Sequence, residues 1–205
     1  MARPAHGKYF TRYSMSDALK QKRKATYEDI LNLPENMVGE IIDGELFVSP
    51  RPANKHALAA TRLTGKLEPK FGGGGEGPGG WWIISEPEIH SGKKPNEDVY
   101  VPDLAGWRRE RMPEYPDEPY FKMIPDWVCE ILSPSNMRLD RAKKVPQYAE
   151  LGVQHLWLIN PRDKTLEAFR LEAGKWSLLS THVEADKVRV EPFEAMEFDL
   201  GALWA

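Results

Sequence analysis

Two carboxylates interrupt the most apolar stretches of the chain, and they constrain the fold more than any other feature. Asp103 lies within residues 99–107, VYVPDLAGW, and Glu130 lies within residues 126–132, DWVCEIL. Both runs are typical of strands in a buried sheet. A buried carboxylate needs a proton, a cationic partner or a bound metal ion, because burying a bare charge is very costly. Two such groups on one face of adjacent strands repel each other unless positive charge lies between them.

A divalent metal ion would meet this requirement. Oxygen ligands from two strand carboxylates suit Mg²⁺ or Mn²⁺ better than zinc. With a nearby lysine, such a site can hydrolyse phosphodiesters, since the metal activates water and the ammonium stabilises the charge that develops. The pattern also allows a purely structural alternative. In that alternative, Asp103 pairs with Arg108, and Glu130 pairs with Lys143 or Lys144.

Composition excludes several other classes of protein. The single cysteine, Cys129, rules out an intramolecular disulfide and a cysteine-rich zinc site, and strand alternation turns it away from Glu130. Ser133 lacks the context of a nucleophile elbow. No apolar run approaches the ~20 residues of a membrane span, so we expect a cytoplasmic protein without membrane contact. The formal net charge is −3, so a nucleic-acid partner requires a local basic face.

We expect one domain with an N-terminal arm. Residues 1–24 are polar and basic without a sustained period, which predicts a flexible arm before a single domain at 25–205. Met15 is an alternative start to Met1. The glycine-rich segment 72–80 lacks the Gly-Lys-Ser/Thr ending of a phosphate-binding loop and is expected to be a flexible connector.

Local signals predict most of the elements. Thr26 caps a helix at 27–33, and Asp43-Gly44 between β-rich runs predicts a hairpin at 38–48. Glu40 lies in the first arm of this hairpin. The alternative to a functional role is that Glu40 is an outward-facing strand residue. Asn54 caps a helix at 55–70 that ends at Pro69 and Gly72. Its predicted apolar stripe is Ala57, Ala60, Leu63, Thr64 and Leu67.

The first turn of that helix contains His56, for which an exposed or internally satisfied side chain is the alternative to a functional one. Farther along, residues 81–89 are predicted to form one strand, and the proline-rich loop 108–125 is expected to be a lid or rim. A helix follows at 140–151, with Pro146 either kinking it or lying in its first turn. The remaining predicted strands are 154–160, 165–170, 176–180 and 187–190.

Several motifs in order resemble the Uma-two family of endonucleases, within the PD-(D/E)xK, restriction endonuclease-like superfamily. They are EIIDGE at 40–45, Ser49-Pro50 followed by His56, VPDL at 101–104, DWVCEILSPS at 126–135, Asp140 with Lys144 and Tyr148, and GVQHLW at 152–157. Each motif alone is weak, but their order and spacing are specific. The resemblance covers residues 26–159 and, more loosely, the tail.

This resemblance implies an α/β fold with a restriction endonuclease-like core: a mixed central β-sheet flanked by helices, with an N-terminal β-hairpin. It implies Asp103 and Glu130 as metal ligands and Glu40 as a third acidic residue of the site. The superfamily lysine is expected two residues after Glu130, where this chain has Leu132. The family pattern then points to Lys144 on the following helix.

Lys143 is the alternative for this lysine, because Pro146 leaves the helical phase open. Three further residues are candidate substrate contacts: His56, Asp140 and Tyr148. Together these features predict a Mg²⁺-dependent endonuclease, with Mn²⁺ as a substitute, that hydrolyses phosphodiester bonds in DNA. The alternative is a non-catalytic nucleic-acid- or protein-binding module on the same fold. A homodimer through the tail strands and a preference for DNA over RNA are left open by the sequence.

Overall fold

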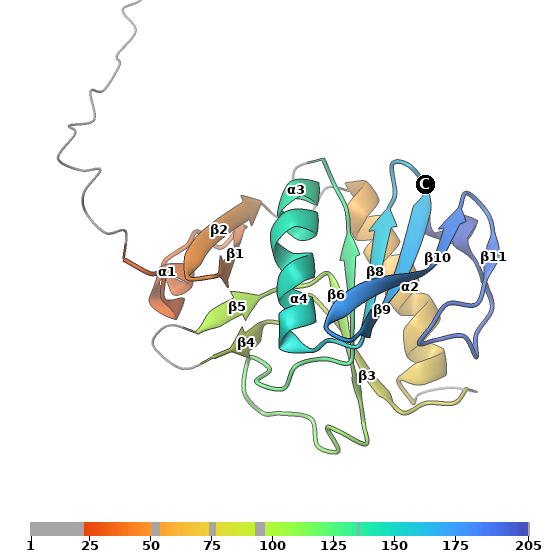
Figure 1. Ribbon diagram of the computed structural model, residues 1–205, viewed down its shortest axis with the longest axis horizontal. Helices are drawn as coiled ribbons and strands as arrows, with labels where there is room; N and C mark the ends of the chain where they lie inside the picture. The colour runs from red at the N-terminus through yellow and green to blue at the C-terminus, as the bar shows by residue number, and fades with distance from the viewer. Residues whose placement is uncertain (1–22, 51–53, 74–76, 93–96, 135, 205) are drawn as a thin grey trace, which may run out of the picture.

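Two β-sheets organise the chain in the computed structural model, which describes residues 23–50, 54–73, 77–92, 97–134 and 136–204 (Figure 1). The larger sheet has the strand order β10-β9-β8-β7-β6-β3. Its strands are β3 (Trp81–Ser85), β6 (Leu104–Arg108), β7 (Trp127–Ile131), β8 (His155–Asn160), β9 (Thr165–Glu172) and β10 (Lys175–Val183). Only β7 and β8 are parallel neighbours in this sheet; the other neighbours are antiparallel. The predicted mixed central sheet is therefore confirmed.

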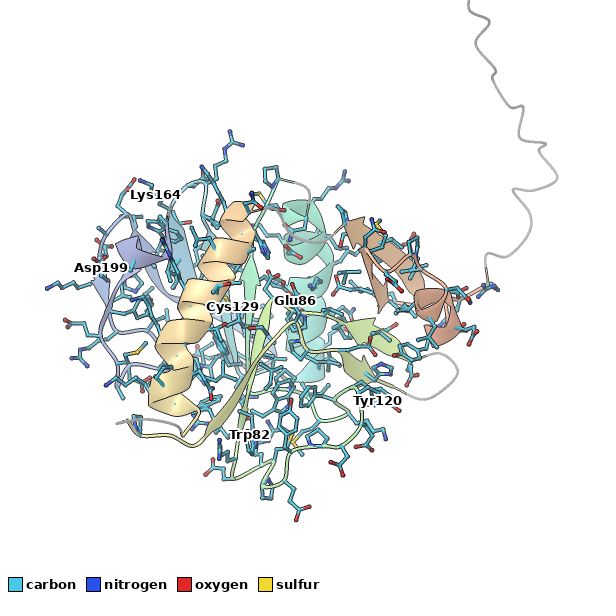
Figure 2. All side chains as sticks on the ribbon, turned by 180° about the vertical axis from the view of Figure 1, so that it is seen from behind. Trp82, Glu86, Tyr120, Cys129, Lys164 and Asp199 are labelled. Atoms are coloured by element: carbon cyan, nitrogen blue, oxygen red, sulfur yellow. The ribbon has the colours of Figure 1, made fainter. Side chains whose placement is uncertain are left out.

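Helices cover both faces of the six-stranded sheet. On one face lies α2 (Asn54–Phe71); on the other lies a continuous helical segment of α3 (Met137–Leu139), the π-helix η2 (Asp140–Lys144) and α4 (Val145–Leu151). Figure 1 shows α4 in front of the sheet, and Figure 2, from behind, shows α2 in front. Strand alternation divides β7 between the two layers, since Cys129 packs in the α2 layer and Val128 in the α4 layer.

The predicted hairpin is confirmed as β1 (Met37–Ile42) and β2 (Glu45–Pro50). Asp43 and Gly44 have φ values of 56° and 75°, the left-handed pair that a tight two-residue hairpin turn requires. The hairpin belongs to a four-stranded sheet of order β2-β1-β5-β4. The other strands of this sheet are β4 (Ile89–Ser91) and β5 (Asp98–Tyr100), and α1 (Tyr27–Leu31) packs beside β1.

Two predicted strands are wrong in the same way. Each of the segments 81–89 and 99–107 forms two strands, and the two halves belong to different sheets. A proline lies at each break, Pro87 in the first and Pro102 in the second, and proline cannot donate to a strand ladder. Asp103 therefore lies where the chain crosses from β5 to β6, directly before β6, rather than within a strand.

The phase of α2 also differs from the prediction. This helix continues through Pro69 to Phe71, whose side chain is buried. Its buried stripe is His56, Ala59, Leu63, Leu67 and Phe71, whereas Ala57 is exposed. The exposed alternative for His56 is therefore wrong.

The helix predicted at 140–151 is present but irregular. Pro146 lies in the first turn of α4, which is one of the two predicted placements. Since Pro146 has no N–H to complete the preceding turn, the helix widens there into the π-turn of η2. Gly152, with φ 82°, ends the segment.

The segment after β6 packs on the sheet and does not border the candidate site. Met112 and Phe121 are buried, and Phe121 stacks on Trp107 with ring centroids 4.2 Å apart. These apolar anchors hold the loop on the sheet, and none of its residues lines the pocket described below. The predicted lid or rim is therefore wrong.

The two ends of the domain also bear on the predictions. In the tail, β11 (Lys187–Val188) pairs with β12 (Phe198–Asp199) rather than with β10, and the 3₁₀ helix η3 (Leu200–Leu203) follows. At the start, Ala25 N–H donates to the carbonyl of Gly44 at 2.8 Å. Most of the predicted arm, including Met15, lies outside the described residues, as do positions 74–76 of the predicted connector. None of the described helices is long and apolar enough to cross a membrane.

We predict that Leu63→Ala lowers the free energy of unfolding by about 2–5 kcal/mol, because Leu63 is fully buried between α2 and the sheet. Urea denaturation measures this change. Thr61→Ala, at an exposed position of the same helix, is the matched control and should alter stability by less than about 0.5 kcal/mol. Equal midpoints for the two variants would contradict the placement of α2.

Candidate functional site

A pocket of about 190 Å³ lies between the hairpin, the start of α2 and the helical segment that follows β7. Six of the seven predicted site residues line it: Glu40, His56, Asp103, Glu130, Asp140 and Lys144. They come from β1, α2, the crossing before β6, β7 and η2. Glu86 also lines the pocket, and Figure 2 shows it near the centre of the molecule, between α2 and the four-stranded sheet.

The ammonium of Lys144 lies at the centre of the acidic groups. Its Nζ is 2.8 Å from Glu130 Oε1, 3.0 Å from Glu40 Oε1 and 3.8 Å from Asp140 Oδ1. It also donates to the carbonyl of Val101 at 3.2 Å. Lys143 is exposed and forms no ion pair with any residue that the structure describes. The geometry therefore favours Lys144 over Lys143 as the lysine that replaces the one missing at position 132.

Both oxygens of Asp103 contact polar groups of the protein. Oδ2 accepts the backbone N–H of Ile131 at 2.6 Å, and Oδ1 lies 3.0 Å from His56 Nε2. His56 is thus brought against Asp103, and its Nδ1 is buried without a hydrogen-bond partner in the described part of the chain. The structural alternative that paired Asp103 with Arg108 is wrong, because the Arg108 guanidinium lies over the ring of Trp81 instead.

Glu40 and Tyr148 both face the interior. Glu40 Oε1 accepts the backbone N–H of Val101 at 2.8 Å, so the outward-facing alternative for Glu40 is wrong. Tyr148 is the predicted site residue that does not line the pocket. Its hydroxyl lies behind Glu130 and donates to Glu130 Oε1 at 2.5 Å. The predicted substrate contact of Tyr148 is therefore corrected to a contact that orients Glu130.

Carboxyl groups outnumber cationic groups in the pocket. Burial raises the pKa of Glu130 well above its ordinary value, and together with the nearby carboxylates it outweighs the opposing effect of Lys144. Burial, with Asp103 and Glu40, likewise raises the pKa of Asp140 to about 7 against the lowering effect of Lys144. Burial alone would lower the pKa of Lys144, but Glu130 and Glu40 raise it above its ordinary value. The ammonium therefore stays charged.

The predicted set of three metal-binding carboxylates is not assembled. Among the described residues, no three His, Cys, Asp or Glu side chains are placed to hold a metal ion together. The ammonium of Lys144 instead contacts both Glu40 and Glu130. Mg²⁺, however, is commonly held by one or two carboxylates with water and substrate phosphate. The oxygen donors, the excess of carboxyl groups and the unpartnered, buried Oδ2 of Asp140 fit such an ion.

Four polar residues that line the pocket were not predicted as site residues: Ser49, Glu86, Ser133 and Asn136. The N–H and hydroxyl of Ser133 donate to Asn136 Oδ1 at 2.7 and 2.8 Å, which fixes the turn after β7. The polar turn sequence after β7 was the available signal for this pair. Glu86 has a φ of 49°, a strained backbone conformation that no sequence pattern predicts.

A mixed sheet between helices, with a carboxylate–lysine pocket where it meets a smaller sheet, defines a restriction endonuclease-like α/β protein. The chain belongs to the Uma2 family, whose model, described as "Putative restriction endonuclease", matches residues 26–201. Among solved structures, it resembles a putative nuclease belonging to DUF820 from Anabaena variabilis ATCC 29413. That likeness has a TM-score of 0.62 and 23% identity over 87% of this chain and 97% of the other, and it bears on the fold. No curated protein matches the chain.

We predict that Asp140→Asn raises the free energy of unfolding of the metal-free protein at pH 8. The pKa of Asp140 is raised from 3.8 to about 7, so the folded state binds its proton more tightly than the unfolded state. Protonation of Asp140 therefore stabilises the folded state relative to the unfolded state, and this stabilisation declines as pH rises from about 4 to 7. The gain from Asn should be near zero at about pH 4 and, at ~1.4 kcal/mol per pKa unit, reach about 4 kcal/mol above pH 7.

Denaturation of both proteins in chelator, over this pH range, measures the gain. Glu150→Gln, at an exposed position of α4, is the control and should show no such pH trend. A loss of stability at pH 8 in Asp140→Asn would mean that Asp140 serves chiefly as an ion-pair partner of Lys144.

Proposed function

We propose that this protein is a Mg²⁺-dependent endonuclease that hydrolyses phosphodiester bonds in DNA. The observation that carries the proposal is the ammonium of Lys144, 2.8 Å from Glu130, in a pocket that Asp103 also lines. Paired carboxylates with a fixed ammonium suit the charge that develops on a phosphoryl group. Membership of a restriction endonuclease family supports nuclease chemistry and a nucleic-acid substrate.

In this proposal Asp103 and Glu130 hold Mg²⁺. The ion, when bound, supplies positive charge beside the phosphoryl oxygens and lowers the pKa of a bound water. The protein orients both carboxylates beforehand. Ile131 N–H and His56 fix Asp103, and the hydroxyl of Tyr148 fixes Glu130. Such outer contacts support metal affinity because they hold the ligands in one orientation.

Lys144 acts as a fixed cation in the same proposal. Glu40 and the Val101 carbonyl hold its ammonium in place, and the surrounding carboxylates keep it protonated. From this position it can orient the attacking water or neutralise charge on the phosphoryl group. Glu40 then positions the lysine and remains available as a third acidic group near the ion.

A second candidate function is a nucleic-acid-binding module without catalysis. It is favoured by one observation, the contact of Lys144 with Glu40 and Glu130 in place of a three-carboxylate metal set. The two functions differ in their requirement for metal. A module that binds DNA only through phosphate charge needs no metal ion, so it does not need Asp103 as a metal ligand. Metal titration of variants at Asp103 therefore separates them.

We predict that Lys144→Ala lowers the DNA cleavage rate by about 10²–10³-fold, the usual effect of losing one group that stabilises developing charge. It should also lower the stability of the metal-free protein, because it leaves Glu130 and Glu40 buried without their cation. Lys143→Ala is the matched control and should retain full activity and stability, since its side chain is exposed. Cleavage of a plasmid under single-turnover conditions gives the rates.

An active Lys144→Ala protein beside an inactive Lys143→Ala protein would show that the lysine role belongs to Lys143. Full activity in both variants would remove the ammonium from the mechanism altogether. Thermal melts of each variant show whether a lower rate reflects an unfolded protein.

We predict that Asp103→Asn abolishes Mg²⁺ binding, Mg²⁺-dependent thermal stabilisation and DNA cleavage, while the metal-free protein stays at least as stable as wild type. Asparagine removes one of several repelling charges but can still accept the N–H of Ile131. Calorimetric titration with Mg²⁺ and Mn²⁺ and melts with and without metal measure these effects. A ligand stabilises only the state that binds it, so both readouts should change together.

Glu86→Gln is the control. It removes a carboxylate that lines the same pocket but is not a proposed metal ligand. It should keep most of the metal affinity. If wild-type protein shows neither heat of binding nor a shift in melting temperature, the metal-dependent mechanism fails and the binding module remains.

A further inference from the structure

The proposed substrate and the pocket carry the same sign of charge. DNA is a polyanion, and the formal net charge of the chain is −3. Among the described residues, five carboxyl groups and one ammonium line the pocket. Such a pocket repels a phosphate backbone unless cations outside it supply the attraction. The position of those cations decides how DNA could approach.

Three exposed cations in separate elements lie at the end of the six-stranded sheet where β7 leads into the pocket: Lys55, Arg138 and Arg162. Lys55 precedes His56 in the first turn of α2, and Arg138 precedes Leu139 in α3; His56 and Leu139 both line the pocket.

Arg162 belongs to the turn between β8 and β9. Because β8 runs parallel to β7, with Ile159 opposite Ile131, the C-terminal ends of the two strands lie at the same end of the sheet. Both views show the start of α2, the start of α3 and this turn at that end (Figures 1 and 2).

These three side chains have no acidic partner among the residues that the structure describes. Other exposed arginines are paired, for example Arg141 with Glu167 and Arg170 with Glu172. The first turn of α2 also contains no acidic residue, so the positive end of its helix dipole is not offset there.

We infer that Lys55, Arg138 and Arg162 form a cationic rim that binds the phosphate backbone of duplex DNA on either side of the phosphate held in the pocket. This inference rests on the proposed function. It adds a positively charged surface that can attract the DNA backbone, which the acidic pocket cannot do. A pocket of about 190 Å³ has room for a phosphate but not for a length of duplex, so the flanking backbone must lie outside it. Cations on three separate elements suit an extended backbone better than a single small anion.

The test compares the triple variant Lys55→Gln/Arg138→Gln/Arg162→Gln with wild type. Binding of a fluorescein-labelled duplex of random sequence is measured by anisotropy in chelator, where cleavage does not proceed, over about 50–200 mM salt. The slope of log affinity against log salt should fall by about 0.9 for each phosphate that the variant no longer neutralises, and affinity at the lowest salt should fall at least ~10-fold. With Mg²⁺, KM for cleavage should rise while kcat changes little.

Lys175→Gln is the matched control. It removes an exposed cation at the first residue of β10, directly after the turn from β9. This turn lies at the opposite end of the same sheet because β9 is antiparallel to β8. A triple variant that binds and cleaves as Lys175→Gln does would overturn the rim while leaving the proposed nuclease intact. Wild-type protein that neither binds nor cleaves duplex DNA overturns both. Tighter, equally salt-dependent binding of RNA or single-stranded DNA would overturn the assignment to duplex DNA.

Discussion

The buried ion-pair network around Lys144 is the interaction on which the rest of the structure depends. Its ammonium contacts Glu40 from the four-stranded sheet and Glu130 from the six-stranded sheet, and it reaches Asp140 within its own helical segment. Without a cation, these buried carboxylates would each need a proton or an opening to water. The same contacts therefore compensate the charge of the pocket and join two sheets that otherwise belong to separate hydrogen-bonded ladders.

One ammonium does not balance the acidic groups, and this imbalance distinguishes the pocket from a structural salt bridge. A site built only for stability would pair each charge or replace it with apolar groups, since buried pairs contribute little net stability. Here the pKa values of Glu130 and Asp140 remain raised, and Asp140 Oδ2 has no partner among the described residues. Perturbed carboxylates that line a pocket are the usual sign of a site that gives up stability for function.

The placement of Asp103 depends on a break in the backbone. If residues 99–107 formed one strand, Asp103 would lie within a single ladder rather than between two sheets. The break at Pro102 lets β5 pair with β1 and β6 pair with β7, so Asp103 lies where both sheets meet. The parallel break at Pro87 brings Glu86 to the same place, where its N–H donates to the carbonyl of Asp103 at 3.0 Å.

The sequence by itself determined the features that depend on near neighbours in the chain. Asp43-Gly44 specified the hairpin turn, and the apolar runs specified β7 and β8. Lys144 was predicted from the family pattern, because the chain has leucine at position 132. Tertiary structure decided what depends on distant partners: which sheet each half-strand joins, the burial of His56 against Asp103, the position of Tyr148 behind Glu130, and the packing of the loop after β6. Local patterns fix backbone conformation through sterics and turn chemistry. Sheet membership and helix phase, in contrast, follow from burial against residues far away in sequence, which no short pattern encodes.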